Sequence, residues 1–219
     1  MGYWDDRHHP QAQAATFAAQ AKTFAARFAS KAAEYDRTGA APLEYFEALF
    51  PTGILSLVVN RKDGGFNGGL AEAQAVVREI GVGEPATSLI LAMHYAIHAA
   101  VARRIGWPEP LAKKLTEEPL SRIALVNALQ LEPKAGSPPR GGLPGTLARR
   151  SATGWSISGH KLYSIASPIL TSAVVLARTD EPEPRVGPFL VPTKVQGFRI
   201  VETWNPVGIR ATASHDVIF

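Results

Sequence analysis

The chain has 219 residues, of which 46% are hydrophobic, and a formal net charge of +4 from 23 basic and 19 acidic residues. This composition is typical of a globular protein and excludes a disordered one, and the length allows one or two domains. Because the sequence contains no cysteine, it excludes disulfides, thiolate metal sites and a cysteine nucleophile, as fits a cytoplasmic protein.

The N-terminus and the charge pattern exclude further classes. Asp5 and Asp6 stand where a signal peptide would be basic, and no apolar segment follows them. The most apolar long segment, residues 86–101, is shorter than the ~20 residues that span a bilayer. The basic residues form no long run and are not interleaved with aromatic residues. We therefore expect a soluble protein with no membrane span and no nucleic-acid partner.

The first half of the chain predicts helices. Residues 11–36 are rich in alanine, the strongest helix former, and their aromatic residues recur at helical spacing on one face. In the long helix predicted at 85–105, residues Leu89 and Met93 belong to the buried face. Gly81 is expected to close the helix before it, and the apolar run 54–59 is too short to classify. The other predicted helices are 43–50, 70–80 and 108–118.

The second half of the chain predicts strands with turn signals at short intervals. A loop with four prolines and four glycines, residues 133–145, follows the first of them. Helices followed by strands predict an α+β chain, with an all-helical domain in residues 1–119 and an antiparallel, β-barrel-like domain in residues 120–219. The predicted strands are 123–131, 146–152, 154–164, 171–178, 187–191, 198–204 and a last one opening at 217.

His94 and His98 are a candidate metal pair, because residues four apart on a helix lie on one face. The segment reads H-Y-A-I-H and lacks the glutamate of metalloprotease chemistry, and no carboxylate-rich element accompanies it. We interpret both as core or subunit-facing histidines and predict no metal site.

Two other patterns do not carry chemistry. Ser214, His215 and Asp216 are the residue types of a hydrolase triad, but adjacent residues of a strand point to opposite faces and cannot form the relay. The glycine clusters at 64–69 and 141–145 lack the Lys-Ser/Thr pair of a phosphate-binding loop, and we interpret them as ordinary loops.

Four segments, in this order, resemble the acyl-CoA dehydrogenase family. A Gly-Gly loop precedes a helix that ends in E-x-G, here residues 79–81, and residues 131–137 read L-E-P-K-A-G-S, similar to the family's T-E-P-x-A-G-S. Residues 154–178 combine G-W-x-x-x-G-x-K-x-Y with a V-V-L-A-R strand, and residues 208–216 read G-x-R-x-T-x-S-x-D. The four segments are spread over most of the chain, and their common order makes the resemblance specific.

The resemblance implies a helical domain, a middle β-domain and a C-terminal helical bundle, with FAD bound between the last two. The family reaction is α,β-dehydrogenation of an acyl-CoA thioester in fatty acid metabolism: a carboxylate removes the α-proton while the flavin accepts the β-hydride. Carried onto this sequence, the residues expected at the flavin are Gln130, Leu131, Tyr163, Ser164 and Ile165, with Ser137 near the acyl-CoA.

The chain departs from the family pattern in three places. Leu131 replaces the threonine of T-E-P, and Ile165 occupies the position of a second flavin-side hydroxyl. The sequence stops at Phe219, before the bundle that carries the catalytic carboxylate, so the β-domain is incomplete and no catalytic residue is assigned. Either the sequence is a fragment of a longer protein, or the bundle would come from a partner, in a homo-oligomer or another complex. A related flavin-dependent monooxygenase and a non-catalytic truncated paralogue that binds a partner subunit remain as alternatives.

Overall fold

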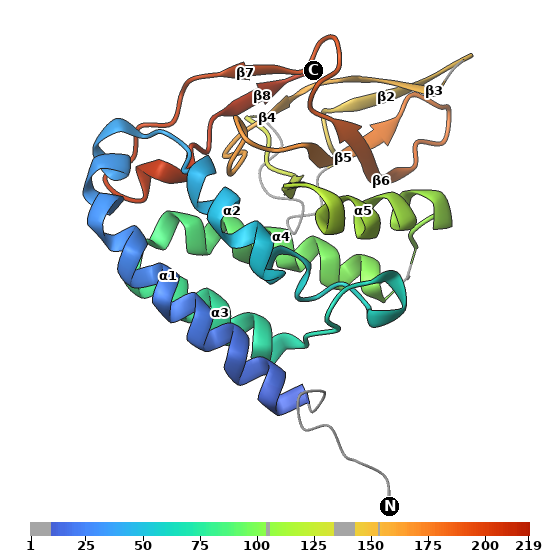
Figure 1. Ribbon diagram of the computed structural model, residues 1–219. Coiled ribbons are helices and arrows are strands. Elements are labelled where there is room, and N and C mark those ends of the chain that lie inside the picture. The colour runs from blue at the N-terminus through green and yellow to red at the C-terminus, as the bar shows by residue number, and fades with distance from the viewer. Residues whose placement is uncertain (1–9, 104–105, 134–142, 153) are drawn as a thin grey trace, which may run out of the picture.

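Helices form one layer of the protein and strands form the other (Figure 1). The computed structural model describes residues 10–103, 106–133, 143–152 and 154–219. The α-helices are α1 (Pro10–Thr38), α2 (Leu43–Leu49), α3 (Leu70–Gly83), α4 (Pro85–Ala102) and α5 (Glu109–Ser121). Short 3-10 helices are η2 (Phe50–Thr52), η3 (Ile54–Ser56), η4 (Arg61–Asp63) and η6 (Arg210–Thr212). The predicted order of helices before strands is confirmed.

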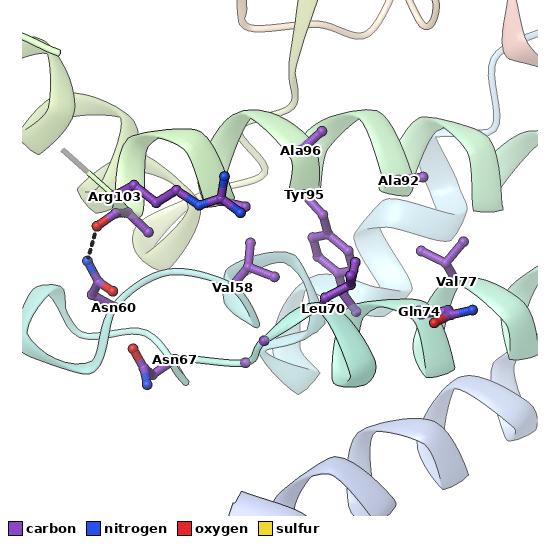
Figure 2. Close-up of a pocket in the computed structure, with 15 residues that line it drawn as sticks. Val58, Asn60, Asn67, Leu70, Gln74, Val77, Ala92, Tyr95, Ala96 and Arg103 are labelled. Carbon is purple, nitrogen blue, oxygen red and sulfur yellow. Dashed lines mark hydrogen bonds between the residues drawn. The ribbon is translucent and has the colours of Figure 1, made fainter. Parts of the chain in front are cut away.

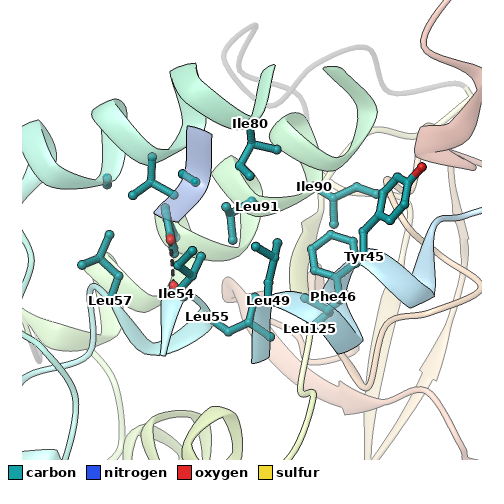
Figure 3. Packing of buried hydrophobic residues seen from close by; sticks show 14 of the residues in the cluster. Tyr45, Phe46, Leu49, Ile54, Leu55, Leu57, Ile80, Ile90, Leu91 and Leu125 are labelled. Atoms are coloured by element: carbon teal, nitrogen blue, oxygen red, sulfur yellow. Dashed lines mark hydrogen bonds between the residues drawn. The ribbon is translucent and has the colours of Figure 1, made fainter. Parts of the chain in front are cut away.

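The helical layer has a core of aromatic and aliphatic side chains (Figure 3). The Phe28 ring of α1 stacks on Tyr45 of α2 with their centroids 3.9 Å apart. Gly83 lies against the backbone of α1, where an added Cβ would come within 2.0 Å of the Ala25 carbonyl oxygen, so only glycine allows this approach. Gly81 does not close α3, because the helix continues to this contact.

Strands form two sheets. They are β1 (Val126–Leu129), β2 (Leu147–Ser151), β3 (Gly154–Ser158), β4 (His160–Lys161), β5 (Ser172–Thr179), β6 (Val186–Pro192), β7 (Arg199–Val201) and β8 (Asp216–Ile218). The larger sheet has the order β1-β5-β2-β3, with β6 also paired to β5, and the smaller has the order β4-β8-β7. Over the described residues the sheets do not close into a barrel. The expected antiparallel pattern holds only in part, because β1 and β2 both pair with β5 in parallel.

Helix α4 connects the two layers. Glu84 caps its N-terminus, because its carboxylate accepts hydrogen bonds from the backbone N–H groups of Ala86 and Thr87. The helix packs against α3, α5 and β1. Its 18 residues have a mean hydropathy of 1.3, so by length and composition alone it could cross a membrane. Half of that window is buried inside the protein, and a core helix meets the same criterion.

His94 and His98 lie inside the core, as predicted. Their ring centroids are 4.3 Å apart, and both side chains are almost fully buried. His94 Nε2 lies 2.9 Å from the Leu55 carbonyl oxygen, whereas neither ring nitrogen of His98 has a partner among the described residues. Burial lowers the pKa of His94 to about 4, and burial, with repulsion from His94 as the smaller cause, lowers the pKa of His98 well below its usual value.

The two histidines therefore make the free energy of unfolding depend on pH. Their folded-state pKa values lie below the unfolded value near 6.5. Their contribution to the free energy of unfolding is therefore fully present above pH 6.5 and is lost as the pH falls toward 4. Each histidine costs about 1.4 kcal/mol per pH unit in that window. We expect His98→Leu to remove its share of the loss, seen in urea unfolding at pH 7.5 and 5. An unchanged pH dependence in this variant would contradict the assignment.

Candidate functional site

A cavity of about 360 Å³ opens between α4, the end of β1, the segment after β4 and η6. Its volume lies within the range of small-molecule sites. No charged side chain is among its lining residues in the described part of the chain, so the lining suits a neutral group. The lining residues are Leu89, Met93, Asn127, Ala128, Gln130, Leu131, Leu162, Tyr163, Ile165, Trp204, Ile209, Thr212 and Ser214.

The structure brings together most of the residues that the sequence assigned to a flavin. Gln130 and Leu131 come from the end of β1, and Tyr163 and Ile165 come from the turn after β4, yet all four line this cavity. Ser164 does not line it. Its backbone N–H donates to the His215 carbonyl oxygen at 3.0 Å, which turns the residue into the protein, where its side chain is fully buried. Ser137 lies outside the described residues.

Other cavity residues were not identified as site residues from the sequence. Leu89 and Met93 were predicted on the buried face of α4, but both are only half-buried because they border the cavity. A helical pattern of apolar residues does not distinguish a core contact from a ligand contact. Trp204 and Ile209 lie outside the resemblance's flavin segments, and no local signal identifies them.

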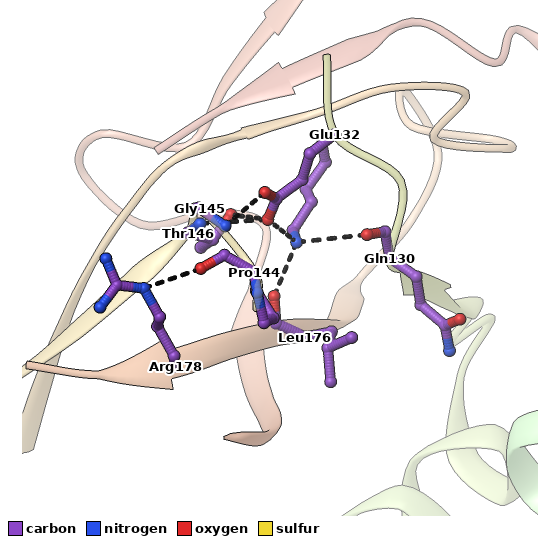
Figure 4. A network of polar contacts seen from close by, with 8 residues as sticks. Gln130, Glu132, Pro144, Gly145, Thr146, Leu176 and Arg178 are labelled. Atoms are coloured by element: carbon purple, nitrogen blue, oxygen red, sulfur yellow. Dashed lines mark hydrogen bonds and ion pairs between the residues drawn. The ribbon is translucent and has the colours of Figure 1, made fainter. Parts of the chain in front are cut away.

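The loop after β1 is held by a buried ion pair (Figure 4). Lys161 Nζ lies 2.6 Å from Glu132 Oε1 and also donates to the Leu176 carbonyl oxygen at 2.6 Å. Glu132 accepts further hydrogen bonds from the backbone N–H groups of Gly145 and Thr146 and from the Thr146 hydroxyl. Burial raises the pKa of Glu132, but the hydrogen bonds from Lys161 and Thr146 outweigh it and keep the pKa below its usual value.

The ion pair sets the two loops side by side. The Leu131 carbonyl oxygen accepts a hydrogen bond from the Leu162 backbone N–H at 2.9 Å, directly next to the paired residues Glu132 and Lys161. The glutamate of L-E-P and the lysine of G-x-K thus contact each other and not the cavity. Leu131, next to Glu132, and Tyr163, two residues after Lys161, line the cavity instead.

Backbone strain is concentrated around the cavity. In the described chain the non-glycine residues with positive φ are Asn67, Tyr163, Ala166, Ile209 and Ala213, and all but Asn67 line the cavity or adjoin a residue that does. Ile209, with φ of 51°, is β-branched, so this left-handed conformation costs it about 1–2 kcal/mol. Strained residues of this kind cluster at functional sites, where the surrounding structure holds them in place.

A larger hollow of about 570 Å³ lies between α3 and α4 on another face (Figure 2). Val58, Leu70, Val77 and Tyr95 form its apolar walls, and Arg103 lies at one end near Asn60. None of the residues that the sequence assigned to a flavin lines it, so the smaller cavity is the candidate site.

Breaking the buried ion pair should lower the stability of the protein. Lys161→Met leaves the Glu132 carboxylate buried without its cation, which we expect to lower the free energy of unfolding by about 3–5 kcal/mol. Lys113→Met is the matched control, because Lys113 pairs with Glu117 on the exposed face of α5 and should cost less than about 0.5 kcal/mol. Urea denaturation measures both, and equal effects would show that the buried pair is not a structural anchor.

Relieving the strain at Ile209 should stabilise the protein. Asparagine tolerates the left-handed conformation, and the Ile209 side chain is 43% exposed, so Ile209→Asn should raise the free energy of unfolding by about 1 kcal/mol. Val207→Asn, at a fully exposed residue without positive φ, should change it by less than about 0.5 kcal/mol. Thermal unfolding tests the pair, and a destabilised Ile209→Asn protein would refute the strain at this position.

Two family models together match almost the whole chain. The acyl-CoA dehydrogenase N-terminal domain matches residues 11–116, and the acyl-CoA dehydrogenase middle domain matches residues 131–219. The second match contains the ion pair and the cavity residues from Leu131 to Ser214.

Curated relatives include both dehydrogenases and nitrososynthases. YdbM of Bacillus subtilis (strain 168), whose name places it among the acyl-CoA dehydrogenases, is 29% identical over 191 residues, which are 87% of this chain and 50% of the relative. L-evernosamine nitrososynthase of a Micromonospora species is 27% identical over 198 residues, 87% of this chain and 45% of the relative. The chain spans about half the length of the curated relatives it matches.

Solved structures share the fold. KijD3 in complex with FMN and a dTDP-linked amino-keto sugar superposes with a TM-score of 0.84 at 25% identity, covering 94% of this chain and 51% of that one. FMN-bound TdsC from a Paenibacillus species gives a TM-score of 0.82 at 21% identity, over 93% of this chain and 50% of that one. The two-layer fold, the matching domains and the named relatives together show that this chain belongs to the acyl-CoA dehydrogenase family.

Proposed function

We propose that this chain forms the flavin-facing wall of a flavin-dependent oxidoreductase, with the flavin ring in the cavity between α4 and the strand layer. One observation carries the proposal: Gln130, Leu131, Tyr163 and Ile165 come from two distant segments and meet at one cavity. The lining fits a flavin ring, because it is uncharged and includes the buried, unpartnered indole nitrogen of Trp204. The family suggests FAD, and the FMN in the KijD3 and TdsC structures makes FMN the alternative.

The first candidate reaction is α,β-dehydrogenation of an acyl-CoA thioester. Relatives named as acyl-CoA dehydrogenases support it. When bound, the flavin would accept the hydride. Leu89 and Met93 of α4 would hold the apolar acyl chain and exclude water. No carboxylate is among the described residues that line the cavity, so the base would come from outside the described chain.

The second candidate is oxygen-dependent monooxygenation by reduced flavin. Leu131 and Ile165, which both line the cavity, present methyl groups where the family pattern has hydroxyls. An apolar flavin edge keeps water away from the ring, as a reaction with oxygen requires. The relatives named as nitrososynthases and the TdsC structure described as a dibenzothiophene monooxygenase also support this candidate.

Flavin binding by the purified chain is the first test. We expect FAD or FMN to bind saturably, with quenching of flavin fluorescence on titration. Leu131→Thr restores a hydroxyl at the flavin edge and should tighten binding about fivefold, equivalent to about 1 kcal/mol for one hydrogen bond. Leu131→Val is the matched control, because valine has the shape of threonine without the hydroxyl. If neither flavin binds, the proposed function is wrong.

The two candidate reactions are distinguished by which compound changes the oxidation state of the flavin. In the first, an acyl-CoA such as butyryl-CoA bleaches the oxidised flavin without oxygen. In the second, acyl-CoA has no effect, and the protein loaded with reduced flavin consumes oxygen faster than free reduced flavin does. The assays use the chain together with any segment or subunit that completes it. Flavin binding with neither reaction would instead support a non-catalytic paralogue.

A further inference from the structure

We propose that the indole N–H of Trp204 donates a hydrogen bond to the flavin ring and replaces the donors missing at Leu131 and Ile165. This inference rests on the proposed function and assigns a cofactor contact to a residue outside the flavin segments of the resemblance. Trp204 follows β7 and lines the cavity together with Leu131, Tyr163 and Ile165.

The position of Trp204 is fixed by its neighbours. Its backbone N–H donates to His215 Nδ1 at 3.2 Å, and the carbonyl oxygen of the same His215 accepts the backbone N–H of Ser164. The indole ring packs edge to face against Tyr163, with the centroids 6.0 Å apart. His215 therefore holds both aromatic residues of the cavity wall in one arrangement.

The indole nitrogen is a buried donor without an acceptor. Nε1 of Trp204 is shielded from solvent and has no hydrogen-bond partner among the described residues. A buried donor left without a partner costs about 1–3 kcal/mol, so buried tryptophan N–H groups are normally paired. Since the described residues supply no acceptor and Trp204 lines a cavity, the geometry assigns the acceptor to the group that fills it.

A flavin ring supplies that kind of acceptor. Its edge carries carbonyl oxygens and unprotonated ring nitrogens, which need donors from the protein. Other polar side chains of the wall have partners in the protein: Asn127 Nδ2 donates to the Ile165 carbonyl oxygen and its Oδ1 accepts from the Ala128 backbone N–H. One of the hydroxyls of Thr212 and Ser214, which lie 2.8 Å apart, donates to the other. Among the described residues that line the cavity, Trp204 is the one whose buried side-chain donor atom has no partner at all, and Leu131 and Ile165 provide no donor.

Trp204→Phe tests the contact, because it keeps the aromatic ring and removes the donor. We expect the dissociation constant for the flavin to rise about five- to twentyfold. Trp155→Phe is the matched control: Trp155 packs edge to face against Phe189, away from the candidate cavity, and its variant should bind flavin like the unchanged chain. Bound flavin should also quench less of the total tryptophan emission in Trp204→Phe than in Trp155→Phe.

A second variant separates the hydrogen bond from packing. Trp204→His keeps a ring and an N–H donor, so its affinity for the flavin should lie closer to that of the unchanged chain than the affinity of Trp204→Phe does. Circular dichroism melts establish that each variant is folded. Unchanged affinity in Trp204→Phe, or equal losses in both variants, would overturn the inference while leaving the proposed function intact. Absence of flavin binding by the unchanged chain would overturn both.

Discussion

The buried ion pair between Lys161 and Glu132 is the interaction on which the geometry of the cavity depends. Removing both charges from water is costly, and the cost is offset because both oxygens of Glu132 and the ammonium group of Lys161 have further hydrogen-bond partners. Lys161 reaches the Leu176 carbonyl oxygen of β5, and Glu132 reaches the backbone of Gly145 and Thr146 before β2. The pair thereby holds together four segments, namely the loop after β1, β4, β5 and the residues before β2, and the adjoining Leu131 and Leu162 line the cavity.

The opposite wall is fixed independently, from the helical layer. The backbone N–H of Arg210 donates to the Asp36 carboxylate at the end of α1, and its guanidinium donates to the Asp36 carbonyl oxygen. This contact joins η6, which carries Thr212, to a residue 174 positions earlier in the chain. Because α4 packs against η6 and β1, a change in the layer spacing would move Leu89 and Met93 relative to Tyr163. The cavity is thus a property of both layers together.

The sequence predicted what depends on local chemistry. The alanine-rich α1, the proline at the start of α4 and the continuous apolar run of β5 each formed as expected. The parallel pairing of β1 with β5 was missed because the pairing depends on the long connection between them and not on either strand. The apolar run 54–59 is too short for its period to indicate an element. In the structure η3 occupies its start, and the Tyr95 hydroxyl of α4 donates to the Ile54 carbonyl oxygen.

The same division applies to the candidate site. Gln130, Leu131, Tyr163 and Ile165 could be located from the sequence because they sit inside recognisable segments, and the structure placed them at one cavity. Ser164, between Tyr163 and Ile165, does not line the cavity because its side chain is buried in the protein. Trp204 cannot be recognised from the sequence, because an unpartnered buried donor is visible only in the folded structure.

The segments that match the family pattern supply the buried ion pair of Glu132 and Lys161, whereas the residues that depart from it, Leu131 and Ile165, line the cavity. A family scaffold that keeps its internal ion pair while its ligand surface loses hydroxyls can bind the same kind of ring and still carry out different chemistry on it. Between proteins that share this fold, a difference in flavin chemistry is therefore to be sought at the cavity surface and not in the fold.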